Sequence, residues 1–263
     1  MSGHRSRRGS LGRQLTTSLC CAAALVFGVA PAIGQETNKI DTQIRVKYQY
    51  QQLVKERIRA FGMVRYDELL GSDAVLGEWN RLASTGGVSY DLSPRVRLEG
   101  ALGLYYTWRP LVEDLFEVRL WQAVTLDWPD SLGKWRRFFF SHRLMLEERF
   151  SWTTDWEFAA RLRYRLATAY PINRYSLEPG AFYAPLSVEL FATPGEDIQE
   201  LFSEQARVTA GLGYVLNKTW SVELRYTRQR SRDTITDDVH TTDNIIDLRF
   251  RTSIRIRDLL RSR

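Results

Sequence analysis

Residues 138–150, FFFSHRLMLEERF, decide the fold together with residues 156–170, WEFAARLRYRLATAY. Even positions of the first stretch are mostly apolar, as at Leu144, whereas odd positions carry charges such as Arg143 and Glu147. Apolar side chains therefore recur every second residue, which is the period of a β-strand and excludes an amphipathic helix with its period of 3.6. Both stretches are predicted to be strands with one apolar face.

The same alternation continues along the chain, and its apolar set always occupies the even positions. It recurs in residues 96–108, 116–128, 182–192, 202–216, 220–227 and 244–256. Most of these segments exceed the roughly 5–6 residues that are typical of strands in soluble proteins. Turn-forming pairs such as Ser93-Pro94 and Asn217-Lys218 separate them. The pattern predicts an all-β fold with one domain, a single antiparallel up-and-down barrel.

The first 34 residues have the features of a cleaved secretory signal peptide, so residues 35–263 form the predicted barrel domain. An apolar run at residues 15–29 follows a cationic start that contains Arg5, Arg7, Arg8 and Arg13. The whole chain has 37 Lys+Arg and 31 Asp+Glu, and removing these four arginines leaves 33 bases against 31 acids. Cys20 and Cys21, the two cysteines, also fall in the apolar run. The mature chain is therefore nearly neutral and excludes disulfides and thiol chemistry.

Alternating strands occur in soluble barrels, which bury the apolar face, and in membrane barrels, which expose it to lipid. Residues 35–263 contain 28 Arg and only five Lys. Arginine suits an enclosed lumen better than lysine, because its guanidinium pairs bidentately and is weakly hydrated. Aromatic residues near strand ends resemble the girdles of outer-membrane barrels, namely Trp108, Trp128, Trp156, Tyr170, Tyr214 and Trp220. We expect a transmembrane barrel in the bacterial outer membrane, with a soluble periplasmic binding protein as the alternative.

The strand count depends on where the termini lie. With both termini on the periplasmic side, counting back from the last strand gives ten strands, the first in residues 57–66. The alternation runs unbroken through residues 41–66, in which Gly62 is the only Gly, Pro, Asn or Asp after position 41. A hairpin near Gln51-Gln52, with a compensating one elsewhere, makes twelve. We expect about ten strands, with twelve as the alternative.

Several of these strands carry motifs that resemble a known family. They are HRLMLEERF at residues 142–150, RLRYRL at 161–166, EQAR at 204–207, AGLGY at 210–214 and ELRY at 223–226. Over roughly residues 79–250 the chain resembles a bacterial family of uncharacterised outer-membrane-type β-barrel proteins, catalogued as a domain of unknown function. The resemblance implies a fold and a location, and it brings no established activity or catalytic residues. The family pattern tends to place a His before the last strand, where this chain has Asp243-Asn244.

In a membrane barrel the odd-numbered, polar face of the strands is expected to point into the lumen. Its candidate charge network consists of Arg143, Glu147, Arg149, Arg161, Arg163, Arg165, Glu189, Arg207, Glu223, Arg225, Asp247 and Arg249. The same phase adds Arg97, Glu99, Glu117, Arg119 and Arg251. Buried charges persist only when they are paired, so a network of Arg and Glu is the ordinary filling of a small barrel. A narrow, porin-like passage for small anionic or sugar solutes is the functional alternative.

The enzyme alternative is an outer-membrane lipid hydrolase, of the phospholipase or lipid A deacylase type. Its candidate residues Ser141 and His142 are adjacent in sequence and therefore point to opposite faces of one strand. The sequence thus predicts a non-enzymatic barrel with no cofactor and no metal site. Its expected partners are outer-membrane lipid, lipopolysaccharide and the barrel-assembly machinery, and its balanced charge gives no support for nucleic acid.

Overall fold

The computed structural model describes residues 41–70, 79–110, 112–128, 139–193, 205–232 and 239–255, so the predicted signal peptide lies outside the described residues. Within these ranges no helix is long and apolar enough to cross a membrane. Eleven strands follow one another: β1 (Asp41–Lys55), β2 (Ile58–Leu70), β3 (Asn80–Asp91), β4 (Val96–Trp108), β5 (Leu115–Trp128), β6 (Phe140–Trp152), β7 (Trp156–Pro171), β8 (Phe182–Ala192), β9 (Gln205–Val215), β10 (Trp220–Arg232) and β11 (Val239–Arg255).

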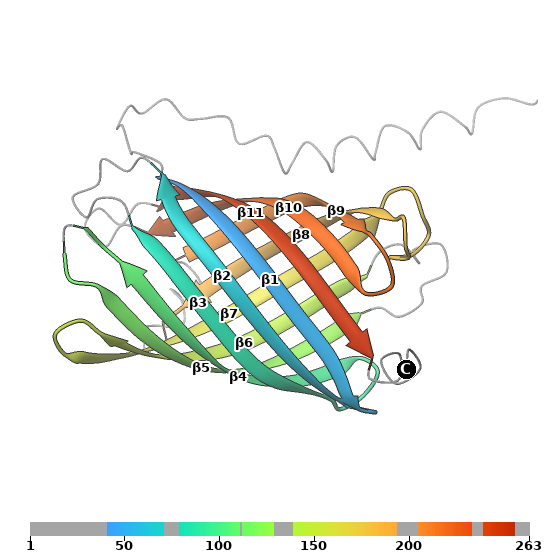
Figure 1. Ribbon diagram of the computed structural model, residues 1–263, viewed down its shortest axis with the longest axis horizontal. Coiled ribbons are helices and arrows are strands. Elements are labelled where there is room, and N and C mark those ends of the chain that lie inside the picture. The colour runs from blue at the N-terminus through green and yellow to red at the C-terminus, as the bar shows by residue number, and fades with distance from the viewer. Residues whose placement is uncertain are drawn as a thin grey trace, which may run out of the picture. The chain divides into compact units, whose positions relative to one another are not determined.

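The strands form a closed barrel in which they run obliquely to the barrel axis (Figure 1). Each strand pairs antiparallel with the next one along the chain, as Leu146 of β6 does with Leu162 of β7. The exception is the seam, where β1 and β11 pair in parallel over thirteen residues each. The predicted all-β, up-and-down barrel is confirmed, and the seam adds one parallel pair to it.

A hairpin between β1 and β2 raises the strand count from the expected ten to eleven. The sequence favoured one overlong strand through residues 41–66, but β1 ends at Lys55 and β2 begins at Ile58. Within the hairpin Gln51 pairs with Phe61, and these partners are both odd-numbered. Even-numbered residues consequently stay on one face on both sides of the turn. The alternation therefore continues through the hairpin and cannot reveal it.

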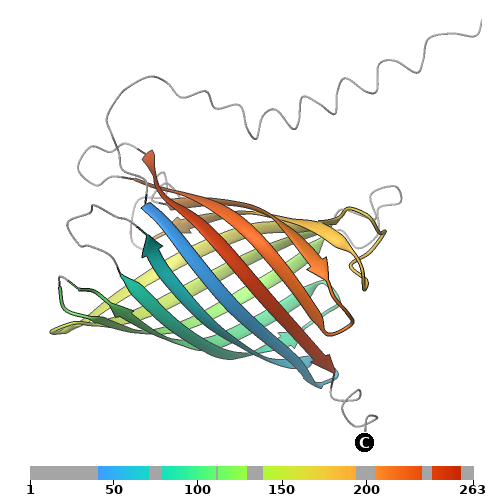
Figure 2. The same ribbon diagram turned by 45° about the horizontal axis from the view of Figure 1, so that its top comes forward.

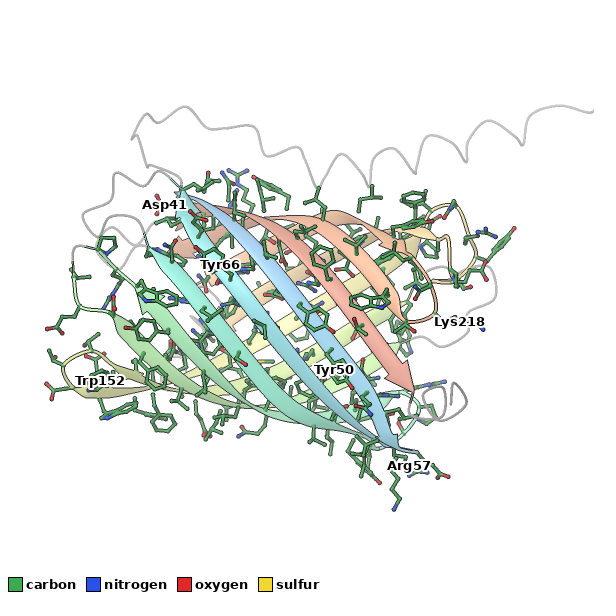
Figure 3. All side chains as sticks on the ribbon, viewed as in Figure 1. Asp41, Tyr50, Arg57, Tyr66, Trp152 and Lys218 are labelled. Atoms are coloured by element: carbon green, nitrogen blue, oxygen red, sulfur yellow. The ribbon has the colours of Figure 1, made fainter. Side chains whose placement is uncertain are left out.

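An odd strand count also corrects the expected placement of the two termini on one side. Since β1 and β11 run parallel, Asp41 and Arg255 lie at opposite ends of the barrel. We call these the Asp41 end and the Arg57 end, after the labelled residues of Figure 3. The turns at Ser93-Pro94 and Asn217-Lys218 both lie at the Arg57 end, and the side-on view of Figure 2 shows the strands running between the two ends.

The outer surface is apolar. Even-numbered side chains such as Leu102, Leu144 and Leu212 are 46–51% exposed although they lie in the middle of long strands. Exposed aromatic side chains mark both borders of this surface (Figure 3). Those at the Asp41 end are Tyr106, Trp108, Trp152, Trp156 and Phe158, and those at the Arg57 end are Tyr90, Trp128, Phe182 and Trp220. The surface is thus an aliphatic belt between two aromatic girdles.

The inside of the barrel holds the charged side chains. Its largest apolar cluster joins Trp121, Met145 and two alanines, with Phe61 packed against them. Much of the remaining buried set is polar or charged, and it includes Glu117 and Glu223 at 1% exposure each. The described residues therefore form a barrel with the reverse polarity of a soluble one, because the apolar side chains face outward and the charged ones face inward.

Candidate functional site

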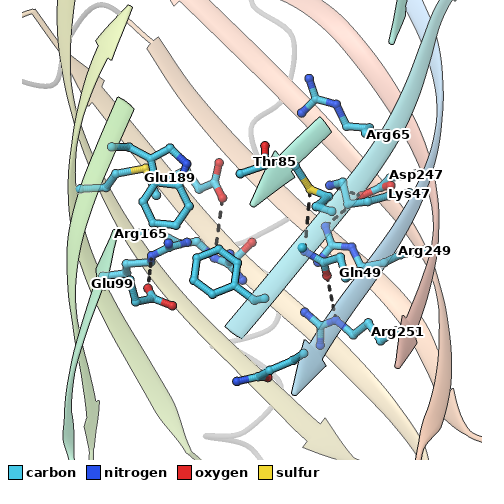
Figure 4. Close-up of a pocket in the computed structure, with 18 of the residues that line it drawn as sticks. Lys47, Gln49, Arg65, Thr85, Glu99, Arg165, Glu189, Asp247, Arg249 and Arg251 are labelled. Carbon is cyan, nitrogen blue, oxygen red and sulfur yellow. Dashed lines mark hydrogen bonds and ion pairs between the residues drawn. The ribbon is translucent and has the colours of Figure 1, made fainter. Parts of the chain in front are cut away.

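A cavity of about 730 Å³ occupies the lumen. Its lining contains fifteen cationic side chains (part of the lining is drawn in Figure 4). They are Arg45, Lys47, Arg65, Arg81, Arg97, Arg119, Arg143, Arg149, Arg161, Arg163, Arg165, Arg207, Arg225, Arg249 and Arg251. Of the acidic residues that the structure describes, four line the same cavity, namely Glu99, Glu147, Glu189 and Asp247. The lumenal surface is therefore strongly cationic although residues 35–263 carry nearly equal numbers of basic and acidic residues.

Two carboxylates near the Asp41 end each hold two arginines. Asp67 accepts from Arg45 Nε at 2.7 Å and lies 2.9 Å from Arg65 Nη2. Glu117 on β5 accepts from Arg119 Nη2 at 2.7 Å and from Arg149 Nε on the neighbouring β6. Both carboxylate side chains are 1% exposed. Each buried carboxylate thus fixes guanidiniums from adjacent strands in the lumen wall.

Acids on neighbouring strands compensate most of the arginine row of β7. Arg161 donates to Glu147 Oε2 on β6 with Nε at 2.9 Å. Arg163 bridges two strands, because Nη2 lies 2.7 Å from Glu189 Oε2 on β8 and Nη1 lies 3.5 Å from Glu147 Oε1. Arg165 Nε lies 3.6 Å from Glu189 Oε1. Three guanidiniums therefore share two carboxylates.

A third group of charges surrounds Glu223 and Asp247 on β10 and β11. Arg225 Nη2 lies 2.6 Å and Arg251 Nη1 lies 2.9 Å from the Glu223 carboxylate. Arg249 lies 3.8 Å from the same carboxylate and 3.0 Å from Asp247. Lys47 reaches Asp247 at 3.4 Å across the β1–β11 seam (Figure 4). Ion pairs thus tie the parallel seam together from the inside.

Buried aromatic rings support several of these guanidiniums. Arg161, Arg163 and Arg207 lie 4.8–5.3 Å from the ring centroid of Phe191, which is 1% exposed. Arg119 lies 3.9 Å from the centroid of Tyr105. Cations are attracted to aromatic faces, and the attraction grows where water is excluded. The rings hold the guanidiniums in fixed positions without neutralising them.

Two lining arginines pair with neutral groups instead of carboxylates. Arg81 Nε donates to Thr107 Oγ1 at 2.7 Å, and Arg207 Nε donates to Gln229 Oε1 at 2.7 Å. Among the described residues neither guanidinium lies within ion-pair distance of an acid. Counting every ion pair of the lining cations, fifteen cations share eight carboxylates: Asp67, Asp91, Glu99, Glu117, Glu147, Glu189, Glu223 and Asp247. Among the described residues the lining cations therefore outnumber the carboxylates that they pair with by seven.

The structure places all twelve residues of the predicted charge network inside the barrel. Eleven line the cavity, and Glu223 lies behind them against the lining arginines. Sequence reasoning missed Arg45, Lys47, Arg65 and Arg81 on β1, β2 and β3. Their odd numbers were the available signal, but the hairpin in residues 41–70 was not recognised. The supporting aromatics were missed because apolar side chains were expected only on the even phase.

Ser141 and His142 do not form a catalytic pair in this structure. Ser141 lines the cavity, whereas His142 Nδ1 lies 2.8 Å from Tyr164 Oη. Both His142 and Tyr164 belong to the even, outward phase of β6 and β7. A serine nucleophile needs its base within hydrogen-bond distance, and these two side chains lie on opposite sides of the barrel wall.

Residues 37–240 match the model of a family described as protein of unknown function (DUF2490). The chain belongs to this family. The match confirms the resemblance seen in the strand motifs, and it extends toward the N-terminus to include β1 and β2. A search of curated proteins finds no match. DUF2490 membership thus agrees with the barrel and leaves the activity to be argued from the site.

Proposed function

We propose that this DUF2490 protein is a non-enzymatic barrel of the bacterial outer membrane that forms a narrow passage for small anionic solutes. The observation that carries the proposal is the reversed polarity of the barrel. Fifteen cations line its cavity, and its exposed surface is an aliphatic belt between aromatic girdles. A soluble protein buries its apolar side chains, whereas a membrane barrel exposes them to lipid.

The dimensions of the belt support a membrane location. Twelve residues separate Phe116 from Trp128 on β5 and Phe140 from Trp152 on β6. With a rise of about 3.3 Å per residue and a tilt of about 40°, each half-buried phenylalanine lies about 30 Å along the barrel axis from the girdle tryptophan of its strand. The hydrocarbon core of a bilayer is about 30 Å thick. The belt therefore has the height that a membrane requires.

The charge of the cavity supports anions as the solutes. An excess of cations over their paired carboxylates in a low-dielectric enclosure raises the local concentration of anions and repels cations. Rings of Arg and Lys give pores a preference for anions in the same way. A merely structural lumen needs balanced pairs, because each unpaired buried charge costs stability.

The membrane location is tested by folding the purified full chain in detergent and in lipid vesicles. We expect a heat-modifiable shift on gels and quenching of the girdle tryptophans by brominated lipid. The lumenal Trp121, which is 8% exposed, provides an internal reference that lipid should not quench. A chain that stays monomeric and folded without detergent overturns the membrane location.

The passage is tested by reversal potentials in planar bilayers under a tenfold gradient of potassium chloride. We expect a reversal potential with the sign of the chloride equilibrium potential. This potential should shrink at molar salt because salt screens the lumenal charges. A cation-selective channel, or a folded and inserted barrel without conductance, overturns the passage. The second result leaves a structural envelope barrel.

A further inference from the structure

Eight guanidiniums gather in the half of the cavity nearer the Asp41 end, and we call this group the arginine collar. The collar consists of Arg45, Arg65, Arg81, Arg119, Arg149, Arg161, Arg163 and Arg207. Strands β1, β3, β5, β7 and β9 begin at this end, and β2 and β6 finish there. Arg81 is the second residue of β3 and Arg207 is the third of β9. The collar therefore draws on seven strands around most of the barrel wall.

The collar is short of negative charge. Its ion pairs run to four carboxylates only, namely Asp67, Glu117, Glu147 and Glu189. Glu189 is also shared with Arg165, which lies outside the collar. Arg119 and Arg149 repel Arg161, and Arg163, Arg45 and Arg161 repel Arg207, although Glu147 attracts Arg161 and Glu189 attracts Arg207 more strongly than any single one of these cations repels them. Among the described residues the collar guanidiniums thus outnumber the carboxylates that they pair with by four, and a bound anion reduces the resulting repulsion.

The collar is also prepared for a particular kind of anion. Phe191 and Tyr105 hold five of its guanidiniums through ring contacts, so these side chains are already ordered before a ligand arrives. Arg207 is tied by Nε to Gln229, and among the described residues no carboxylate lies within ion-pair distance of its two terminal nitrogens. A guanidinium fork matches the oxygen geometry of phosphate bidentately. Several forks around one cavity favour an anion that has several oxygens and more than one charge.

We propose that the arginine collar binds a multivalent oxyanion of the phosphate class, either inorganic phosphate or a soluble phosphate monoester. This inference rests on the proposed function, because the ligand enters through the lumen. The cavity of about 730 Å³ lies within the range of about 300–1,000 Å³ that is typical of small-molecule sites. A phosphate ester the size of a metabolite therefore fits in the same space.

The inference is tested by isothermal titration calorimetry on the full chain, folded in a neutral detergent that contains no phosphate. The probes are inorganic phosphate, glucose 6-phosphate and acetate, titrated into a chloride buffer of constant ionic strength. We expect both phosphate compounds to bind at least about tenfold more tightly than acetate, since charge-assisted hydrogen bonds to a multivalent anion are worth more. Equal affinities for phosphate and acetate overturn the inference.

Matched variants locate the site. Arg207→Gln and Arg81→Gln each remove one charge without leaving a carboxylate unpaired, and we expect either to weaken phosphate binding at least about tenfold. The control is Arg59→Gln, because Arg59 is absent from the cavity lining and its partner Asp91 keeps a second ion pair with Arg97. The control should bind phosphate as the wild type does. Equal losses in all three variants overturn the collar as the site.

The two proposals fail in different ways. Phosphate binding to a barrel that does not conduct leaves the collar in place and rejects the passage. Anion-selective conductance that phosphate neither blocks nor slows, together with absent calorimetric binding, rejects the collar and leaves the passage. Phosphate that blocks chloride current in the wild type, and less in Arg207→Gln, supports both.

Discussion

Replacing Glu223 by glutamine tests whether fixed ion pairs hold the charged side chains of the lumen wall in place. The side chain of Glu223 is fully buried, and its carboxylate lies 2.6 Å from Arg225, 2.9 Å from Arg251 and 3.8 Å from Arg249. Tyr183 Oη also donates to it at 2.8 Å. Glutamine keeps the shape of the side chain and one oxygen that accepts from the tyrosine. The substitution therefore removes the negative charge and little else.

The expected loss follows from these contacts. Two guanidiniums within 3 Å of the carboxylate lose their nearest counter-charge. At an effective dielectric constant of about 20, one such pair about 4 Å apart gains about 4 kcal/mol. Removing one partner of a buried ion pair destabilises proteins by about 3–5 kcal/mol, because the remaining charge stays buried. We expect Glu223→Gln to lower the free energy of unfolding by about 3–5 kcal/mol.

The assay is urea unfolding of the barrel in detergent micelles, followed by far-ultraviolet circular dichroism. The control is Glu178→Gln in the β7–β8 connection, where the carboxylate is half exposed and lies 3.8 Å from Arg174. Such an exposed pair is worth about 0–1 kcal/mol. If Glu223→Gln unfolds with the same midpoint as the control, water replaces the missing charge. That result refutes fixed ion pairs in the lumen wall.

Two further predictions concern other parts of the barrel. Gly213→Ala places a methyl group against the ring of Tyr183, so urea unfolding should show that the free energy of unfolding falls by about 1–3 kcal/mol. The control Gly86→Ala has open space around the new methyl group and should change the free energy of unfolding by no more than about 0.5 kcal/mol. Equal losses in the two variants contradict this reasoning. In the β4–β5 connection the backbone N–H of Arg109 donates to Asp114 and holds the pKa of that carboxyl below its ordinary value. Above about pH 4, the pKa of this carboxyl in the unfolded chain, the wild type should therefore melt at a higher temperature than Asp114→Asn. The wild type should lose this advantage as the pH falls further. A difference in melting temperature that does not depend on pH contradicts the prediction.

The polarity of each strand could be predicted from the sequence. In the long segments the even positions are mostly apolar, and the register pairs residues of equal parity, as Leu146 with Leu162. The sequence therefore determined the alternation, the barrel and the charged residues of one face. It could not place the β1–β2 turn at Glu56-Arg57, because a same-parity hairpin leaves the alternation unchanged.

Only the tertiary structure decided the strand number, the parallel seam and the balance of charge in the lumen. An odd or even residue number assigns a side chain to one face of its strand. Its ion-pair partners, however, depend on which strands are neighbours and on their register. Arg163 finds Glu147 and Glu189 on the two adjoining strands, whereas Arg207 finds Gln229. The sequence of β7 contains the arginine row in full, yet closure of the barrel determines which guanidiniums meet an acid and which face the cavity without one. Ion pairing requires side chains to lie close together in space, and for this reason the proposed anion site could be recognised only from the tertiary structure.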